Sequence, residues 1–474
     1  MNSDDRPSFP TPPSGGEGFL ASVARFFKFS EHHTTFRTEI LAGVTTFMTM
    51  AYILAVNPAI LSDAIFLQEA GDLFSELAIA TALSAAIGTA IMALSANYPF
   101  ALAPGMGLNA FFTFSVVIGL GIEWRIALAA VFIEGMIFIG LSLSKIRSQI
   151  IRALPECIKQ ATAAGIGLFL AYIALAGDPA VGGAGLIVAD PVTKTALGNL
   201  NQPPTLMAIA GIVITSALVA RRITGALLWG ILATAVLGWI LGIAAPPTAI
   251  VAWPAFPTDL VGQAIAGLSQ ITRTNLWEFF AVVFVFLFVD LFDTIGTLAG
   301  VAIQAGYIKE NGELPRANQA LMADAIATTV GAFFGTSTVT TYIESAAGVA
   351  EGGRTGFTSA IVAFLFLFSL LFIPLLQAIP AFATAPALVI VGVLMAGNVR
   401  RIRWDDPAES IPSFLTLLII PLSNSIAEGL AVGLMTYPAI KAFQGKARET
   451  TATQWILAAI FLLRFIYMAL NPTE

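Results

Sequence analysis

The sequence predicts an all-α protein that crosses a membrane many times. Of its 474 residues, 57% are hydrophobic and only 11% are charged, whereas soluble domains carry about 25% charged residues. The mean hydropathy is +0.84. Apolar runs recur along the whole chain, each close to the ~20 residues that cross a hydrocarbon core. Three examples are LAIATALSAAIGTAIMAL, IALAAVFIEGMIFIGLSL and TSAIVAFLFLFSLLFIPLL.

Residues 1–30 are predicted to form a disordered cytoplasmic tail. The opening stretch, MNSDDRPSFPTPPSGGEG, is polar, acidic and rich in Pro and Gly, unlike a signal peptide. A single cysteine, Cys157, excludes an internal disulfide and a cysteine metal cluster. The only histidines, His32 and His33, precede the first span. We therefore expect no metal, no cofactor and no histidine-based catalytic site in the membrane.

Fourteen candidate segments follow the tail, with a final apolar stretch after them. With the N-terminus in the cytoplasm, 19 of the 23 Lys and Arg residues fall on the cytoplasmic side, as the positive-inside rule requires. The exceptions are Arg125, Lys194 and Arg273 outside, and Arg464 in the final stretch. The segments are 39–58, 77–96, 108–120, 126–145, 157–177, 205–220, 224–244, 277–300, 319–334, 343–351, 357–378, 384–399, 411–422 and 424–440, then 453–470.

Three of the segments are too short to span: those near Asn109 and Glu344, and IPSFLTLLIIPL, which reads as half of a hairpin. The final stretch, TQWILAAIFLLRFIYMAL, predicts a cytoplasmic interfacial helix over 450–470, with a true span as the alternative. Its Trp455, Arg464 and Tyr467 suit the boundary between lipid and water.

Two broken segments occupy matching positions in the chain. PFALAPGMGLNAFFTF (99–114) and GTSTVTTYIESAAGVAEGG (335–353) each begin with an extended, Pro- or Thr-rich piece. Each continues into small residues and a short helix that carries one polar residue, Asn109 or Glu344. They are third among the first seven and third among the second seven segments, and repeats of odd number face opposite ways. Paired broken segments indicate a transporter's midplane site. The sequence thus predicts a 7+7 inverted repeat.

A third polar feature lies in FVFLFVDLFDTIGTL, residues 284–298. Asp290, Asp293 and Thr297 share one helical face. An ionised carboxylate costs several kcal/mol in an apolar medium, so intramembrane acids indicate function. The structural alternative is that one of these two aspartates caps or bonds to a neighbouring helix and the other faces loop water. Glu134 and Asp324 are interpreted as contacts between helices. Glu428 reads as a polar contact of the 422/424 hairpin.

These groups together suit a small, neutral, planar solute rich in N–H and C=O groups. Carboxylates accept hydrogen bonds from ring N–H groups, while Asn109 and backbone amides donate. A partly desolvated carboxyl group also binds a proton more readily, so the site fits proton coupling. Four phenylalanines are candidates for aromatic walls, with ordinary packing as the alternative: Phe111, Phe112, Phe284 and Phe288.

Over about residues 30–470, the chain resembles the AzgA-type adenine/guanine/hypoxanthine permeases of the nucleobase–ascorbate transporter superfamily. The resemblance is carried by GVTTFMTMAYILAVNP, APGMGLNAFFTF, FVDLFDTIGTLAG and TTYIESAAGVAEGGRTGFTS. It implies fourteen segments in a 7+7 inverted repeat, proton-coupled purine uptake at the cell membrane, and a homodimer, with no nucleic-acid partner. It also implies a core domain (31–150 and 270–380) that moves against a gate domain (151–250 and 381–445).

The resemblance also implies roles for individual residues. Asp293 and Glu344 match the principal base-binding carboxylates and are the proton-coupling candidates, while Asn109 and Asp290 match supporting binding residues. Four further residues are expected to support the site: Gly105, Gly107, Thr297 and Thr341. Uracil and xanthine relatives carry Glu where this chain has Asp293. The shorter acid leaves more room, which is compatible with a purine.

Three rival functions fit the sequence less well. An intramembrane aspartate protease needs acids on two facing helices, whereas Asp290 and Asp293 share one helix, so we do not expect an enzyme. A channel would call for a charged ring, which the two unlike broken segments do not suggest. An anion transporter of the same fold favours neutral or basic groups at the half-helix starts, where this chain has Glu344.

Overall fold

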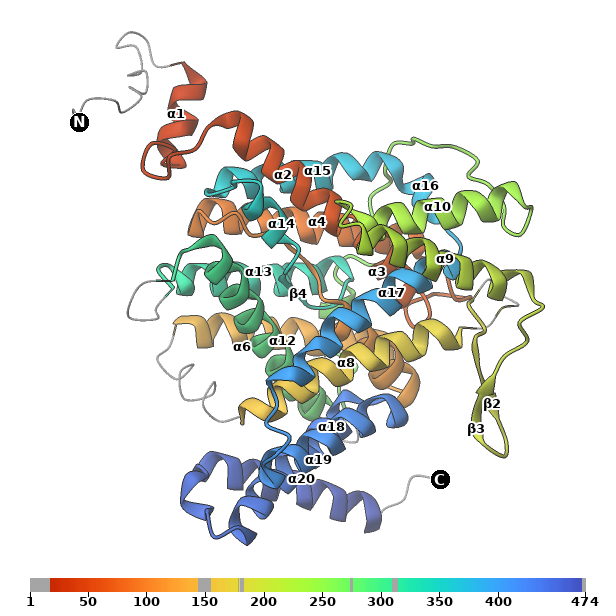
Figure 1. Cartoon of the computed structure of the whole chain (residues 1–474), viewed down its shortest axis with the longest axis vertical. Helices are drawn as coiled ribbons and strands as arrows, with labels where there is room; N and C mark the ends of the chain where they lie inside the picture. The colour runs from red at the N-terminus through yellow and green to blue at the C-terminus, as the bar shows by residue number, and fades with distance from the viewer. Residues whose placement is uncertain are drawn as a thin grey trace.

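The computed structural model describes residues 18–143, 155–177, 179, 183–272, 276–308 and 314–470. Outside them lie residues 1–17 of the expected tail, Arg273, and four cations assigned to the cytoplasm: Lys145, Arg147, Arg152 and Lys309. The longer helices are α2 (Phe36–Met50), α3 (Ile53–Leu61), α4 (Phe74–Ile91), α6 (Trp124–Leu143), α8 (Glu156–Ala176), α9 (Pro203–Ala220), α10 (Ala226–Ile240), α12 (Leu276–Ala305), α13 (Ala317–Phe334), α15 (Gly356–Ser369), α17 (Ala381–Ala396), α18 (Pro407–Ser423), α19 (Ile426–Phe443) and α20 (Ala452–Leu470) (Figure 1).

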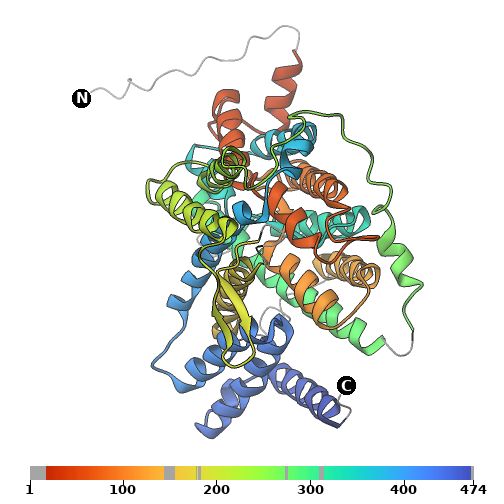
Figure 2. The ribbon, with the colours of Figure 1, turned by 90° about the vertical axis from the view of Figure 1, so that its right-hand side faces the viewer.

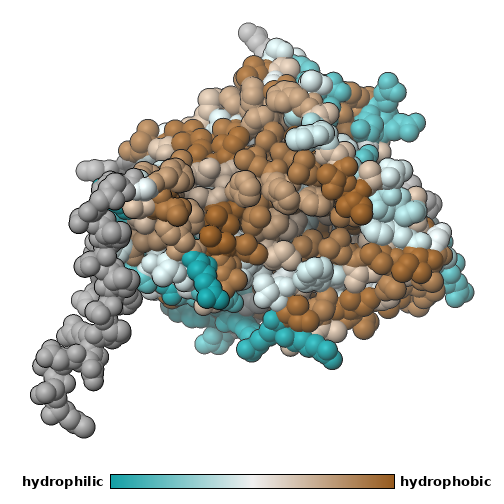
Figure 3. Space-filling view, turned by 90° about the horizontal axis from the view of Figure 1, so that it is seen from above, coloured by the Kyte–Doolittle hydropathy of each residue, from teal (hydrophilic) through white to brown (hydrophobic). Residues whose placement is uncertain are grey.

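The predicted all-α membrane architecture is confirmed. Among the described residues, eight helical stretches are long and apolar enough to cross a membrane. Four shorter apolar helices accompany them: Met106–Gly119, Ala226–Ile240, Pro407–Ser423 and Ala452–Ile466. The face seen from above in Figure 3 is largely hydrophobic, as lipid contact requires.

The two broken segments meet at the centre of the molecule. Strand β1 (Leu102–Pro104) pairs antiparallel with β4 (Val339–Thr341), with Ala103 opposite Thr340. All six residues are buried, and lipid offers no partners for backbone groups at this depth, so each strand satisfies the other. The short helices α5 (Met106–Ala110) and α14 (Ser345–Ala350) follow. The expected sequence of an extended piece and then a short helix is therefore found in both segments.

The helices pack as two groups. α2, α3, α4, α6, α12, α13, α14 and α15 contact mainly one another, and α8, α9, α10, α17, α18 and α19 do the same. Contacts between the groups are fewer. One of them is a hydrogen bond from the Ser115 hydroxyl, in the π-helical stretch η2 (Phe111–Gly119) that continues α5, to the Asn424 carbonyl between α18 and α19. The sliding of one group against the other stays a prediction.

A buried acid that the sequence analysis did not single out ties α2 to α15. Glu39, in the first turn of α2, is fully buried. Its carboxylate accepts hydrogen bonds from the hydroxyls of Thr34 (2.8 Å), Thr355 (2.8 Å) and Thr358 (2.6 Å). It also accepts from the backbone amides of Arg354, Thr355 and Thr358. Glu39 thus satisfies the free N–H groups at the start of α15, where a carboxylate is favoured.

The prediction of a disordered tail up to residue 30 is wrong beyond residue 18. Residues Phe19–Phe26 form helix α1. The chain after α1 is held because Phe27 and Phe29 are almost completely buried and lie edge-on to the ring of Phe357, with ring centroids 5.6 Å apart in both cases. The prediction was based on the polar, Pro-rich residues at the start of the tail, and it did not take the apolar side chains of Phe27 and Phe29 into account.

Residues Phe36–Leu61 form one helical stretch that covers the predicted span 39–58, with a turn at Ala51 and Tyr52 between α2 and α3. A strand hairpin was not among the expected segments. Between α8 and α9, strands β2 (Ile187–Asp190) and β3 (Lys194–Leu197) pair as an antiparallel hairpin. This hairpin projects from the helices and faces the viewer in Figure 2.

The final helix, α20, lies antiparallel to α19. Lys441, near the end of α19, donates to Glu449 (2.9 Å), just before α20 begins. At the other end, Arg464 of α20 contacts Glu428 in the first turn of α19 (2.6 Å). Glu428, expected to be a hairpin contact, thus pairs with the one cation inside the final stretch. The interfacial placement of residues 450–470 stays a prediction.

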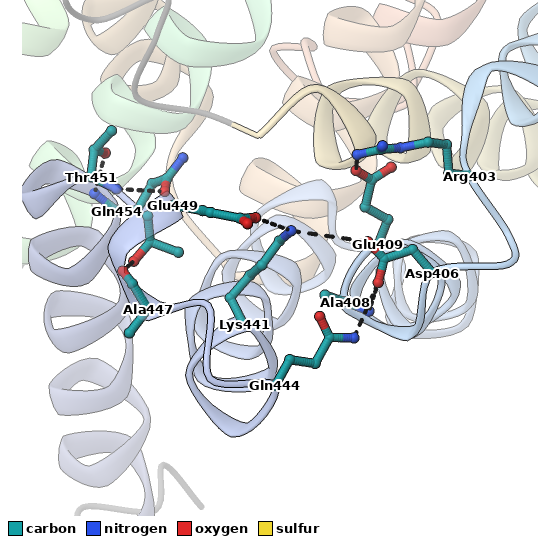
Figure 4. Close-up of polar contacts among 11 residues, drawn as sticks. Arg403, Asp406, Ala408, Glu409, Lys441, Gln444, Ala447, Glu449, Thr451 and Gln454 are labelled. Atoms are coloured by element: carbon teal, nitrogen blue, oxygen red, sulfur yellow. Dashed lines mark hydrogen bonds and ion pairs between the residues drawn. The ribbon is translucent and has the colours of Figure 1, made fainter.

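Polar contacts hold the junction between α18, α19 and α20 (Figure 4). Lys441 lies 3.9 Å from Asp406, and Gln444 donates to Asp406 (3.1 Å). The Gln444 hydrogen bond lowers the pKa of Asp406, and the Lys441 hydrogen bond lowers the pKa of Glu449. Both carboxylates therefore stay charged until the pH falls below the ordinary pKa of Asp and Glu side chains. The contacts at the junction are kept down to the same pH.

Candidate functional site

Asp293 lies near the middle of α12, in a stretch long enough to span the membrane, yet its side chain is exposed. Within the part of the chain that the structure describes, no hydrogen bond or ion pair engages its carboxylate. Its charge interacts with Tyr342, Glu344 and Asp324. Helix α12, which carries Asp293, packs against both β4 and α14 of the second broken segment.

Glu344 lies immediately before α14, at its N-cap position, and is half-buried. Its Oε1 accepts a hydrogen bond from the hydroxyl of Tyr52 (2.7 Å). The Thr49 hydroxyl also lies 3.4 Å from the Glu344 carbonyl oxygen. The structure thus brings Asp293 and Glu344 together from two different segments, with the α2–α3 break beside them.

Asn109, in α5, is fully buried. Neither its Oδ1 nor its Nδ2 has a hydrogen-bond partner among the described residues. The side chain does not cap its own short helix. A buried polar group without a partner costs about 1–3 kcal/mol, so the amide is available for a partner other than the described residues.

Asp290 differs from Asp293 in its burial. It is fully buried, its Oδ2 is 3.4 Å from the Thr328 hydroxyl, and its Oδ1 has no partner among the described residues. Its charge interacts most strongly with Glu134 of α6, then with Asp324 of α13. Asp290 therefore belongs to a cluster of three buried carboxyl groups behind the face that carries Asp293. Its expected contact with the solute stays a prediction.

The other two members of this cluster differ in their bonding. Asp324 accepts hydrogen bonds from Thr294 (2.8 Å) and Thr341 (3.3 Å). It is thus a contact between α13, α12 and β4, as interpreted from the sequence. Neither carboxyl oxygen of Glu134 has a partner in the described part of the chain. The hydroxyl of Thr341 thus bonds to Asp324, and its expected support of the solute site stays a prediction.

Thr297 is half-buried, one turn beyond Asp293. The hydroxyl that bridges α12 to strand β4 is instead that of Thr294, 2.8 Å from the Thr340 hydroxyl. Sequence spacing selected Thr297 because it shares a face with both aspartates. Thr294 follows Asp293 directly and carried no such signal.

The glycines of the first broken segment permit close approach. A Cβ at Gly105 would lie 3.0 Å from Cγ2 of Thr340, and a Cβ at Gly107 would lie 2.5 Å from Cγ2 of Ile166. Ile166 belongs to α8, in the second group of helices. Gly107 therefore lets the broken segment touch the other group.

The four phenylalanines are engaged in ring packing. Phe111 lies edge-on to Phe286 (5.0 Å between ring centroids), and Phe112 is 6.5 Å from the same ring. Phe284 packs on Phe288 (4.2 Å) and on Phe461 of α20 (6.1 Å). Ordinary packing, the alternative to aromatic walls, accounts for these contacts.

Replacing Gly107 by alanine is expected to reduce transport about tenfold or more. The added Cβ overlaps Ile166, and overpacking costs typically about 1–3 kcal/mol wherever α5 and α8 must touch. Uptake by purified protein in liposomes is the measurement. Gly140→Ala is the matched control, because a Cβ there meets nothing within 4 Å. Adding Ile166→Ala should restore transport, and failure to do so would contradict the steric explanation.

Comparison with known proteins gives close relatives. The Permease family matches residues 37–432. The chain is 51% identical to a putative permease of Methanocaldococcus jannaschii, over 94% of this chain and 99% of that protein. It is 44% identical to the guanine/hypoxanthine permease PbuG of Bacillus subtilis, with the same coverage. It is 40% identical to the adenine permease AdeP of Escherichia coli, over 97% of this chain and 98% of that protein.

Among solved structures, the transmembrane domain of the cyanobacterial bicarbonate transporter BicA is similar in fold. The TM-score is 0.60 at 17% sequence identity, covering 84% of this chain and 98% of that chain. Identity this low supports a shared fold and nothing about the solute.

Proposed function

Because this chain belongs to the Permease family, within the nucleobase–ascorbate transporter superfamily, we propose that it takes up purine nucleobases by proton symport and alternating access. The solute is adenine, guanine or hypoxanthine. The observation that carries the proposal is the meeting of Asp293 and Glu344 at the broken segment β4–α14. Two carboxylates and an unpartnered amide match a flat molecule that presents both N–H donors and acceptors.

In this proposal the two acids have different tasks. Glu344 receives a hydrogen bond from Tyr52, which favours its ionised form, so it accepts a ring N–H of the base. Asp293 has no donor among the described residues, and an accessible carboxylate without donors takes up a proton more readily. Asn109, whose amide atoms have no hydrogen-bond partner in the described part of the chain, bonds to the base once the site opens. Asp290 supports Asp293 from behind.

Alternating access would move one group of helices against the other. The strand pair β1–β4 joins both broken segments inside one group, so the site would travel as a unit. The chain is a multi-pass membrane protein. Its residence in the cell membrane, its cytoplasmic N-terminus and its assembly as a homodimer belong to the proposal.

Competition between solutes tests the purine assignment. Uptake of labelled adenine, guanine and hypoxanthine into proteoliposomes should be blocked by excess unlabelled purine bases. Uracil, the nucleoside inosine, sulfate and bicarbonate should have little effect. Anion transport, the alternative weighed from the sequence, is tested by the same measurement. A carboxylate at the start of α14 repels an anion, so better competition by bicarbonate, sulfate or uracil than by every purine would overturn the assignment.

A further inference from the structure

The first membrane segment contributes a side chain to the candidate site. Tyr52 lies at the turn between α2 and α3, inside the apolar run MTMAYILAV, and is completely buried. Its hydroxyl donates to Oε1 of Glu344 at 2.7 Å, although the two residues are 292 positions apart. The Thr49 hydroxyl of α2 also lies near the Glu344 carbonyl oxygen. The end of α2 and the turn after it therefore contact Glu344 at two points.

The donor and the acceptor of this hydrogen bond follow from the chemistry of the two groups. A carboxylate only accepts hydrogen bonds, so the phenol is the donor and Glu344 is the acceptor. Hydrogen bonds to an ionised group are roughly twice as strong as neutral ones, and a buried phenol has no water to compete for it. The contact therefore stabilises the charged carboxylate over the protonated acid. It also fixes the side chain, because Oε1 is held toward α2 while Oε2 stays available.

We propose that Tyr52 is a positioning residue of the base site. It holds the Glu344 carboxylate charged and in one orientation, so that the second oxygen accepts a ring N–H of the solute. This inference rests on the proposed function. It adds a fourth segment, the α2–α3 turn, to a site that the sequence assigned to three other segments.

The titratable groups around Glu344 define what a pH measurement would see. Among the described residues they are Tyr52 from the α2–α3 turn, Asp293 from α12 and Tyr342 from the end of β4. The hydroxyl of Tyr342 is engaged by the carbonyl of Pro104. Tyr52 is therefore the one of these groups that donates to Glu344, and its removal changes that carboxylate most directly.

The test is equilibrium binding of labelled adenine, guanine and hypoxanthine to purified protein in lipid nanodiscs across a range of pH. Tyr52→Phe keeps the ring and removes the donor. We expect about tenfold weaker binding at neutral pH, the loss of one hydrogen bond to a charged group. We also expect the loss of binding on acidification to occur about one pH unit higher, because the charged form is less favoured. Tyr98→Phe is the matched control, since that hydroxyl donates to the Pro315 carbonyl.

A second measurement does not depend on solute binding. The thermal unfolding midpoints of Tyr52→Phe, Glu344→Gln and the double variant form a cycle, and residues in contact give non-additive shifts. Additive shifts, or a Tyr52→Phe protein with wild-type affinity and pH profile, would overturn the inference. Weakening by the same factor at every pH would also overturn it, because Tyr52 would then act on the fold and not on the charge. A wild-type protein that binds none of the three bases would instead refute the proposed function.

Discussion

Replacing Glu344 by glutamine is expected to abolish nucleobase uptake while membrane insertion stays normal. Glutamine keeps the shape of the side chain, but it removes the charge that accepts from Tyr52 and, in our proposal, from the base. The amide has one carbonyl oxygen, so it can accept only one of these two hydrogen bonds, and its NH2 group then faces the other donor. A hydrogen bond to a charged group contributes about 1.5–3 kcal/mol. Because one such bond is lost and the other becomes a weaker neutral one, we expect uptake to fall about 100-fold or more. The measurement is initial-rate uptake of labelled purines, normalised to the amount of protein in the membrane.

Glu351→Gln is the matched control for this variant. Glu351 is exposed at the other end of α14, so it carries the same charge on the same short helix. It should transport at the wild-type rate. If Glu344→Gln retained uptake within a few-fold of the wild type, Glu344 would not belong to the site.

The variant Asp293→Asn is expected to lose accumulation of purine against a concentration gradient, while exchange of purine across the membrane continues. Asp293 is the accessible carboxylate without a donor, and our proposal gives it the coupling proton. Asparagine cannot bind or release that proton at any physiological pH. Concentrative uptake driven by a proton gradient should fall more than tenfold. Counterflow of labelled against unlabelled purine, which needs no net proton movement, should continue at a measurable rate.

The wild type provides the reference for proton coupling. Purine addition should make the medium outside proteoliposomes more alkaline, and a protonophore should abolish accumulation. Accumulation driven only by a sodium gradient would end the proton assignment. Loss of both counterflow and accumulation in Asp293→Asn would assign this residue to solute binding, and the coupling proton would then have to reside elsewhere.

The features that could be predicted from the sequence are those that the lipid bilayer requires of any chain that crosses it. Lipid forces long apolar helices and tolerates extended backbone only where it is buried, so the broken segments around Asn109 and Glu344 stood out. The structure bears out both strands and both short helices. Charged residues inside apolar runs are costly, and that cost alone singled out Asp290 and Asp293.

What sequence could not predict depends on which way a side chain points. Asp290 and Asp293 are three residues apart and appear equivalent, yet one is fully buried behind the other. Tyr52 looks like any aromatic residue in an apolar run, because its partner is 292 positions away. Glu39 is the first residue of the predicted span 39–58, and nothing in the sequence shows that it is fully buried against the start of α15.

The strand pair β1–β4 has a consequence for the synthesis and membrane insertion of the protein. Its two partners, 102–104 and 339–341, lie about half the chain apart. A ribosome adding about 5–20 residues per second needs roughly ten to fifty seconds to synthesise the stretch between them. During that interval the backbone of β1 has no partner strand in the nascent chain, because β4 has not yet been synthesised. The centre of the molecule is therefore completed only after insertion of the second half, and a chain truncated before residue 339 would expose this strand to the quality-control machinery of the membrane.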